Sequence, residues 1–124
     1  MAFQDLKPML RTWDIRGTIN FYVDILGFQC ERFNDEWGWA HMRRDNATIM
    51  LAGPSEHVGD TAPSFTGSLY ITCDDVDGLW IAVKDHVKVC YPIEDFDYGM
   101  REFAIYDNNG YLLQFGKPLN AAES

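Results

Sequence analysis

The second half of the chain repeats the pattern of the first half. Residues 14–17 (DIRG) correspond to 75–78 (DVDG), 61 positions later, and 46–53 (NATIMLAG) correspond to 109–116 (NGYLLQFG), 63 positions later. Two offsets this close indicate one unit used twice. A chain of 124 residues has the size of a single domain. We therefore expect one α+β domain of two tandem βαβββ modules.

Module one is expected at about residues 6–53, a linker at about 54–66, and module two at about 67–117. The expected elements of module one are strands at 8–14, 28–34, 37–43 and 47–52, with a helix at 15–26. In module two they are strands at 67–73, 87–92, 101–107 and 111–116, with a helix at 76–86. The linker is rich in Gly, Pro and polar residues.

Helix and turn signals support these bounds. Asp14 is expected to cap the first helix, and Asp74 or Asp75 the second, because a carboxylate can accept hydrogen bonds from the free first-turn amides. Gly27 is expected to end the first helix. The Asn-Gly pair at 109–110 predicts a hairpin, since both residues tolerate positive φ.

Charge and cysteine usage narrow the possible partners. The chain has 10 basic and 19 acidic residues, a net charge of −9, which repels nucleic acid and anionic membranes. The same field attracts cationic small molecules, although solubility alone also explains an acidic surface. Three cysteines without metal-like spacing predict free thiols, and we expect a cytoplasmic protein. Neither a secretory signal nor an apolar run of about 20 residues is found.

Three stretches carry a family resemblance: residues 6–28 (LKPMLRTWDIRGTINFYVDILGF), 43–52 (RRDNATIMLA) and 98–116 (YGMREFAIYDNNGYLLQFG). Their order and spacing resemble the vicinal-oxygen-chelate superfamily, which includes glyoxalases, bleomycin-resistance proteins and dioxygenases. The bleomycin-resistance branch is the most similar. The resemblance implies cupped half-barrels and a homodimer with pockets at or near the dimer interface.

The resemblance also directs attention to a metal site. Metalloenzymes of the superfamily hold a divalent ion with His and Glu from the first and last strands of each module. The matching positions here are about Lys7 or Pro8, Met50 or Leu51, Ser68, and Gln114, none of which is His or Glu. The three histidines, His41, His57 and His86, lie elsewhere. We therefore expect no metal, no cofactor and no catalytic residues of the metalloenzyme type.

A ligand-binding wall is expected instead. On the strand at 37–43, the alternation puts Trp37, Trp39, His41 and Arg43 on one face, either the core beneath the helix or the wall of a cup. Trp37 and Tyr98 lie near positions that carry drug-stacking aromatics in the bleomycin-resistance branch, although Trp37 could also be a core residue. The expected ligand-binding residues are Trp37, Trp39, His41, Tyr98, Arg101, Phe103 and Gln114.

Two functions follow from these features. The preferred one is a metal-free protein that binds and sequesters a small cationic or planar aromatic ligand, such as an antibiotic, with acidic loops at 35–36 and 94–97 attracting the cation. The alternative is a lyase, isomerase or dioxygenase of the same fold. It would use a shifted metal site or, without metal, His41 or Arg101. The expected partners are the ligand and a second copy of the chain, with neither nucleic acid nor membrane.

Overall fold

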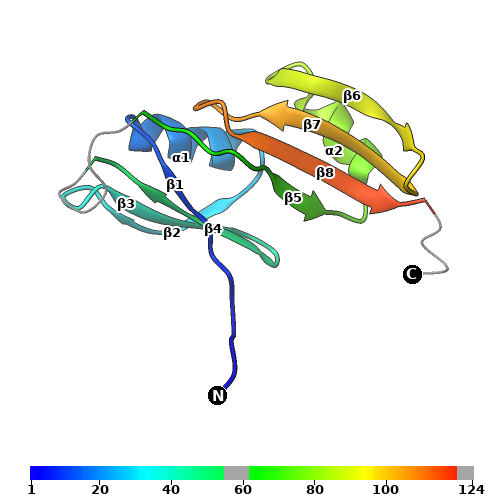
Figure 1. The fold of residues 1–124 in the computed structure, drawn as a ribbon. Coiled ribbons are helices and arrows are strands. Elements are labelled where there is room, and N and C mark those ends of the chain that lie inside the picture. The colour runs from blue at the N-terminus through cyan, green and yellow to red at the C-terminus, as the bar shows by residue number, and fades with distance from the viewer. Residues whose placement is uncertain (55–61, 120–124) are drawn as a thin grey trace. The chain divides into compact units, whose positions relative to one another are not determined.

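The computed structural model describes residues 1–54 and 62–119. The chain divides into two compact units, Met1–Ser64 and Phe65–Ser124. In the described residues each unit contains a helix and a four-stranded sheet (Figure 1). Within these same ranges no helix is long and apolar enough to cross a membrane.

The two units have the same topology. Module one consists of β1 (Met9–Arg11), α1 (Ile15–Asp24), β2 (Gln29–Asn34), β3 (Trp39–Arg44) and β4 (Ala47–Ala52). Module two consists of β5 (Leu69–Thr72), α2 (Val76–Val83), β6 (Lys88–Phe96), β7 (Met100–Tyr106) and β8 (Leu112–Pro118). The sheet orders are β1-β4-β3-β2 and β5-β8-β7-β6, with the first pair parallel and the others antiparallel. The prediction of two βαβββ modules in an α+β fold is confirmed.

Both helices begin with the same Asp-x-x-Gly cap. Asp14 accepts a hydrogen bond from the Gly17 amide, and Asp75 accepts one from the Gly78 amide, each at 3.0 Å. A Cβ at Gly17 would lie 2.1 Å from the Asp14 carboxylate, and one at Gly78 would lie 2.2 Å from Asp75. The glycine therefore makes room for the capping carboxylate, which explains why both residues occur in both modules.

The helices end earlier than the sequence predicts. Gly27 has a φ of +72°, the left-handed conformation expected of a glycine that follows a helix. The regular helix α1, however, already ends at Asp24. The second helix stops at Val83 rather than at residue 86, because 84–86 form turns. The strand predicted at 87–92 is longer in the structure, because β6 continues to Phe96.

The two central hairpins differ by one loop residue. Arg44 pairs with Ala47 across a two-residue loop, whereas three residues, 108–110, separate Asp107 from Tyr111. The hairpin predicted at 109–110 is present between β7 and β8, and in its loop only Gly110 has positive φ. A three-residue loop with a final left-handed glycine is a common hairpin connection.

This extra residue settles which positions correspond between the modules. His41 pairs with Met50 in module one, and Ala104 pairs with Gln114 in module two. Met50, rather than Leu51, is therefore the counterpart of Gln114, and the 63-residue offset between 46–53 and 109–116 was wrong by one residue.

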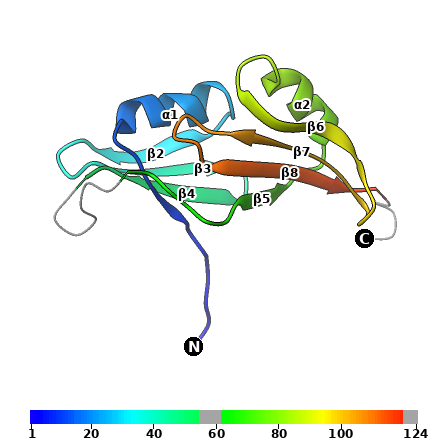
Figure 2. The same cartoon turned by 45° about the horizontal axis from the view of Figure 1, so that its top comes forward.

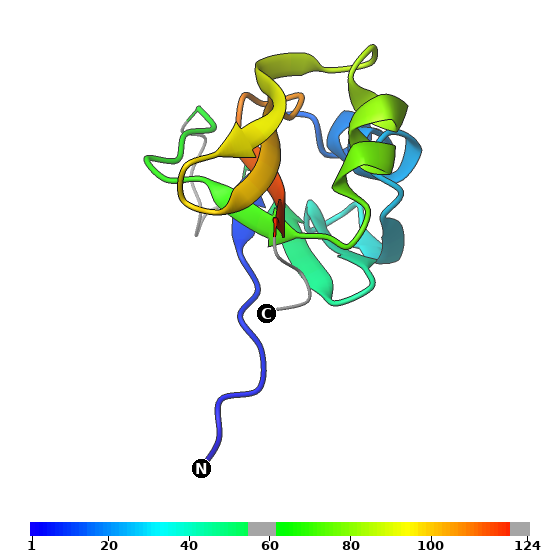
Figure 3. The same cartoon turned by 90° about the vertical axis from the view of Figure 1, so that its right-hand side faces the viewer.

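Each helix covers one face of its own sheet (Figures 2 and 3). The core of each module lies between its helix and that face of its sheet. The buried apolar residues of module one include Tyr22, Leu26, Met42 and Leu51, and those of module two include Val76, Val83, Phe103, Ile105 and Leu113. Full burial of one such large side chain stabilises the fold by about 1.5–3 kcal/mol. The opposite face of each sheet has no helix of its own module over it and carries the polar groups described below.

Candidate functional site

The strand β3 presents two chemically different faces. Ala40 and Met42 are fully buried on the side covered by α1. Trp39, His41 and Arg43 alternate with them and are partly exposed on the other side. The bulky side of the strand is therefore the wall of the open face and not the core beneath the helix.

A register shift in β2 adds a carboxylate to this open face. Cys30 pairs with Met42 and Arg32 pairs with His41, so Glu31 is an extra residue between them. A bulge of this kind redirects side chains that strict alternation would send to opposite faces. Glu31 and Arg32 consequently both reach the face that carries His41.

The open face of module one contains a hollow of about 500 Å³. It is lined by Lys7, Glu31, Arg32, Trp39, His41 and Met50. This volume is in the range of small-molecule sites, which are about 300–1,000 Å³. The lining combines an indole ring with both signs of charge, so it can hold a flat ligand that also carries polar groups.

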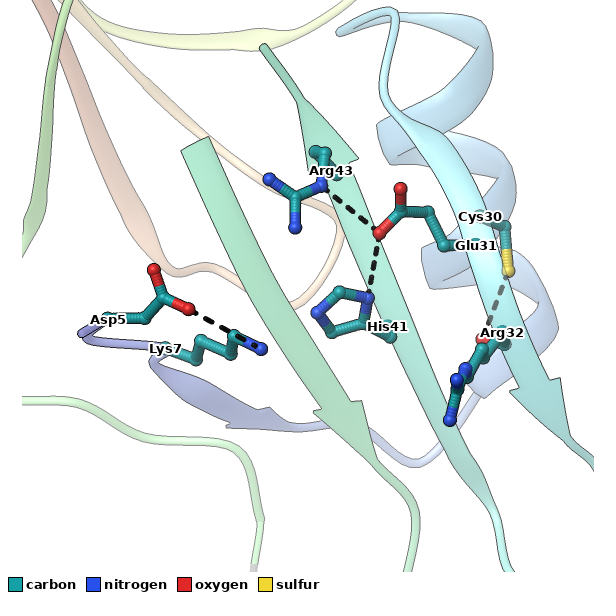
Figure 4. Close-up of polar contacts among 7 residues, drawn as sticks. All are labelled: Asp5, Lys7, Cys30, Glu31, Arg32, His41 and Arg43. Carbon is teal, nitrogen blue, oxygen red and sulfur yellow. Dashed lines mark hydrogen bonds and ion pairs between the residues drawn. The ribbon is translucent and has the colours of Figure 1, made fainter. Parts of the chain in front are cut away.

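His41 is oriented by its neighbours. Its Nδ1 lies 3.0 Å from Glu31 Oε1, and its ring stacks beside that of Trp39 at a centroid distance of 6.3 Å. Figure 4 shows Glu31 between His41 and Arg43, with the end of the Lys7 side chain pointing toward the imidazole. The His41 side chain is 12% exposed, and no described residue hydrogen-bonds to its Nε2. With Nδ1 donating to Glu31, neutral His41 leaves the Nε2 lone pair to accept a hydrogen bond.

Glu31 is held in its charged form. Arg43 Nε donates to Glu31 Oε1 at 3.1 Å. This hydrogen bond lowers the pKa of the Glu31 carboxyl against the opposing effect of desolvation, and the charge of Arg43 and the hydrogen bond from His41 act in the same direction. The carboxylate therefore accepts from both neighbours and fixes the plane of the imidazole.

The open face of module two contains a buried carboxylate. Glu102 is 0% exposed and accepts hydrogen bonds from two tyrosines. Tyr70 Oη donates to Oε1 at 2.8 Å, and Tyr91 Oη donates to Oε2. Glu102 alternates with Phe103 along β7, so it faces away from α2.

A chain of hydrogen bonds extends from this carboxylate along the sheet. Gln114 Nε2 donates to Tyr91 Oη at 2.9 Å, and Ser68 Oγ donates to Gln114 Oε1 at 2.6 Å. Burial, followed by the bond to Glu102, raises the pKa of Tyr91 to about 12 and also raises that of Tyr70. Both hydroxyls therefore remain protonated as donors at neutral pH.

Two predicted ligand residues lie on the helix side of module two. Phe103 is 0% exposed and packs against Trp80 of α2, with ring centroids 5.0 Å apart. Arg101 forms ion pairs with Asp77 and Asp95, both at 2.9 Å. These pairs, through the bond to Asp77 first, raise the pKa of the Arg101 guanidinium. The strand alternation sends Phe103 into the core, and the ion pairs of Arg101 lie on that same side. Whether either residue contacts a ligand stays a prediction.

The predicted aromatics Trp37 and Tyr98 are exposed. Trp37 lies in the turn before β3, 72% exposed, and donates its amide to Asn34 Oδ1 at 2.9 Å. The expectation that it opens the strand was wrong, and so was the alternative of a core role. Tyr98 is 63% exposed and stacks on Phe96 at 5.4 Å. Whether the two rings bind a ligand stays a prediction.

The residues at the superfamily's metal positions do not fit a divalent ion. In module one they offer the ammonium group of Lys7 and the thioether of Met50, both at the hollow. In module two Ser68 and Gln114 are hydrogen-bonded to each other. Among the described residues no group of three His, Cys, Asp or Glu side chains could hold an ion. His57 lies outside those residues.

Sequence reasoning missed four residues of these faces: Glu31, Tyr70, Tyr91 and Glu102. Alternation along 100–106 places Glu102 opposite to Phe103 and is visible in the sequence. Glu31 could not be found in this way, because the shift that redirects it depends on pairing with β3.

Comparisons with known proteins agree with this fold. The family model described as Glyoxalase/Bleomycin resistance protein/Dioxygenase superfamily matches residues 7–115. A protein of unknown function from Agrobacterium tumefaciens superposes with a TM-score of 0.76 at 21% identity, covering 96% of this chain and 97% of that chain. No curated protein matches the chain in sequence.

Two further solved structures with the same fold have glyoxalase-type names. A glyoxalase/bleomycin resistance protein/dioxygenase from Nocardioides has a TM-score of 0.75 at 14% identity, covering 97% of this chain and 87% of its own. A glyoxalase-related enzyme from Clostridium phytofermentans has a TM-score of 0.74 at 18% identity, covering 95% and 97%. At these identities the likeness concerns the fold.

Proposed function

The chain belongs to the glyoxalase/bleomycin resistance protein/dioxygenase superfamily, and from this membership we propose that it binds and sequesters a small organic ligand without converting it. The observation that carries the proposal is the hollow on the open face of module one. Its donor set does not suit the metal on which the superfamily's metalloenzymes depend. Binding is therefore the function that these residues support best.

The lining of the hollow indicates what kind of ligand it takes. A planar aromatic part would stack on Trp39, which is worth about 0.5–1.5 kcal/mol beyond the buried area. His41 Nε2 is buried and has no partner among the described residues, so an N–H or O–H group of the ligand could donate to it once a neighbouring side chain moves aside. The net charge of −9 favours a ligand that also carries positive charge. A partly aromatic antibiotic fits this description, and a cationic group on it would point out of the hollow, toward Trp37 and Glu36, because Lys7 and Arg32 line the hollow and Asp35 is paired with Arg16.

A second copy of the chain is part of the proposal. The superfamily resemblance implies a homodimer, and twofold dimers are the commonest oligomers. Strands β1 and β2 are the edges of the first sheet, and β5 and β6 are those of the second. Edge strands leave backbone groups that a partner can pair or cover.

The binding function is tested by a thermal-shift screen of planar aromatic compounds with and without a cationic group, bleomycin included. Hits are then titrated against wild type, Trp39→Ala and the control Phe33→Ala. Phe33 is opposite Ala40, on the helix side of the same sheet. We expect Trp39→Ala to weaken binding about tenfold, and Phe33→Ala to leave the affinity unchanged. Equal affinities for wild type and Trp39→Ala would refute the module-one site.

One alternative function has a specific observation behind it. The Glu31–His41 pair has the arrangement of an oriented general base, with Nε2 free of any described partner. A metal-free lyase or isomerase could use this nitrogen to remove a proton from a ligand in the hollow. Mass spectrometry of a bound hit after long incubation separates the two functions. Recovery of the unchanged compound supports sequestration, and a product that disappears with His41→Gln supports the enzyme.

A further inference from the structure

The charge of Glu102 has no positive partner in the described part of the chain. The described ion pairs of this module join Arg101 to Asp77 and Asp95, on the helix side of the sheet. Glu94, directly opposite Glu102 on the neighbouring strand, adds a second negative charge. Buried charges in proteins are normally paired, and like charges facing each other across strands are unfavourable. Among the described residues no cation therefore lies beside Glu102, and Lys88, on the same face, sits over the ring of Tyr106 at 5.3 Å.

The hydrogen-bond directions make both oxygens of Glu102 acceptors. Ser68 donates to Gln114 Oε1, which leaves Gln114 Nε2 to donate to Tyr91 Oη. Tyr91 must then direct its own hydrogen to Glu102 Oε2. A group that accepts from tyrosines at both oxygens is suited to the ionised form, which has acceptors only.

Aromatic rings surround this charge. Tyr70 and Tyr91 contact Glu102 through their hydroxyls, and Tyr91 packs edge-on against Phe96 at 5.5 Å. Phe96 in turn stacks with Tyr98. Tyr70 is 44% exposed and Tyr98 is 63% exposed, so ring surface is accessible on this face.

The accessibility of these groups selects the type of cation. Glu102 is fully buried, so a metal ion could not coordinate its oxygens without displacing the tyrosines. Exposed aromatic faces bind weakly hydrated cations through the ring quadrupole, and alkylated ammonium groups are the ligands that such surroundings recognise.

We propose that the open face of module two binds an alkylated ammonium group, held against the rings of Tyr70 and Tyr98 and balanced electrostatically by Glu102 and Glu94. This inference goes beyond the proposed function, because it assigns a separate site for a different chemical group. It uses residues of module two alone, so it can fail while the aromatic site of module one stands.

The test is an NMR titration of the full chain with choline, compared with its neutral isostere 3,3-dimethyl-1-butanol. We expect choline to shift the amide signals of β5, β7 and β8 in a saturable way, and the isostere to leave them in place. Glu102→Gln is expected to weaken choline binding about tenfold or more. Tyr98→Leu removes an exposed ring and should weaken binding roughly three- to tenfold.

Phe33→Ala serves as the matched control, since it alters the other module outside the proposed ligand site and should leave choline binding unchanged. The proposal is overturned if choline does not bind wild type, if the isostere binds equally well, or if Tyr98→Leu and Glu102→Gln both keep wild-type affinity. Tyr98→Leu alone decides the question if Glu102→Gln does not fold. If the wild-type protein binds a planar hit but does not bind choline, this inference is contradicted and the proposed function remains in place.

Discussion

Tyr70 reaches Glu102 because residue 116 has no side chain. A Cβ built on Gly116 would lie 2.2 Å from Tyr70 Oη and 3.3 Å from Glu102 Cβ. Gly116 pairs with Glu102 across β7 and β8, so the tyrosine ring crosses the sheet surface at this position. The buried carboxylate and the glycine thus belong to one arrangement.

Gly116→Ala should displace the Tyr70 hydroxyl and leave one oxygen of Glu102 without its donor. Loss of such a partner destabilises by about 1–3 kcal/mol. Urea denaturation measures the change. The control is Gly53→Ala, where a Cβ would meet its nearest neighbours at an ordinary 3.6 Å. Equal stabilities of the two variants would contradict the arrangement.

The caps provide a second prediction. Gly17→Ala should destabilise the protein by about 1 kcal/mol although Ala is the better helix former, because its Cβ displaces the Asp14 carboxylate. Asp14→Ala removes the same cap. In the double variant the two losses should not add, since the cap can be lost only once. Additive losses in thermal unfolding would show that Gly17 acts in another way.

Stability at high pH should depend on Tyr91. The unfolded chain loses its tyrosine protons near pH 10, whereas Tyr91 in the folded protein keeps its proton to a pKa of about 12. This contribution is therefore fully present below pH 10 and is lost as the pH rises from 10 to 12. The stability of Tyr91→Phe, measured by its urea midpoint, should decrease less steeply than that of wild type between pH 10 and 12. Parallel curves would count against the Tyr91–Glu102 bond.

Trp37→Ala should leave the fold almost unchanged. The side chain is 72% exposed, and surface changes of this kind are usually within about 0.5 kcal/mol. Affinity for a planar hit should nevertheless decrease by about 1–2 kcal/mol if the indole covers the ligand. A melting curve and a titration of the same variant measure both. Unchanged affinity would remove Trp37 from the site.

Assembly and metal content can be measured on one preparation. Light scattering should report a dimer at tens of micromolar, the concentration range of a moderate-affinity dimer. Elemental analysis of protein purified without a histidine tag should find far less than one Zn, Ni, Mn or Fe per chain. A monomer would exclude the dimer, and a stoichiometric metal tied to an activity would favour the enzyme.

The sequence alone was sufficient for the duplicated topology and the helix caps. Both depend on local signals: the repeated Asp-x-x-Gly, the alternation along β3 and the left-handed glycine after α1 can be read within a few residues. The same alternation also places Trp39 and His41 on one face. The alternation does not tell whether the helix packs on that face, because this packing is a contact between segments that are distant in the sequence.

Only the tertiary structure decided which polar groups meet. Glu31 joins His41 through a register shift that depends on two strands, and Glu102 gains donors from residues 32 and 11 positions away. Phe103 and Glu102 are neighbours in sequence, yet one packs beneath α2 and the other forms the polar network. Local propensity is short in range, whereas pairing register and burial arise from the whole sheet, and these determine where the chemistry of this protein lies.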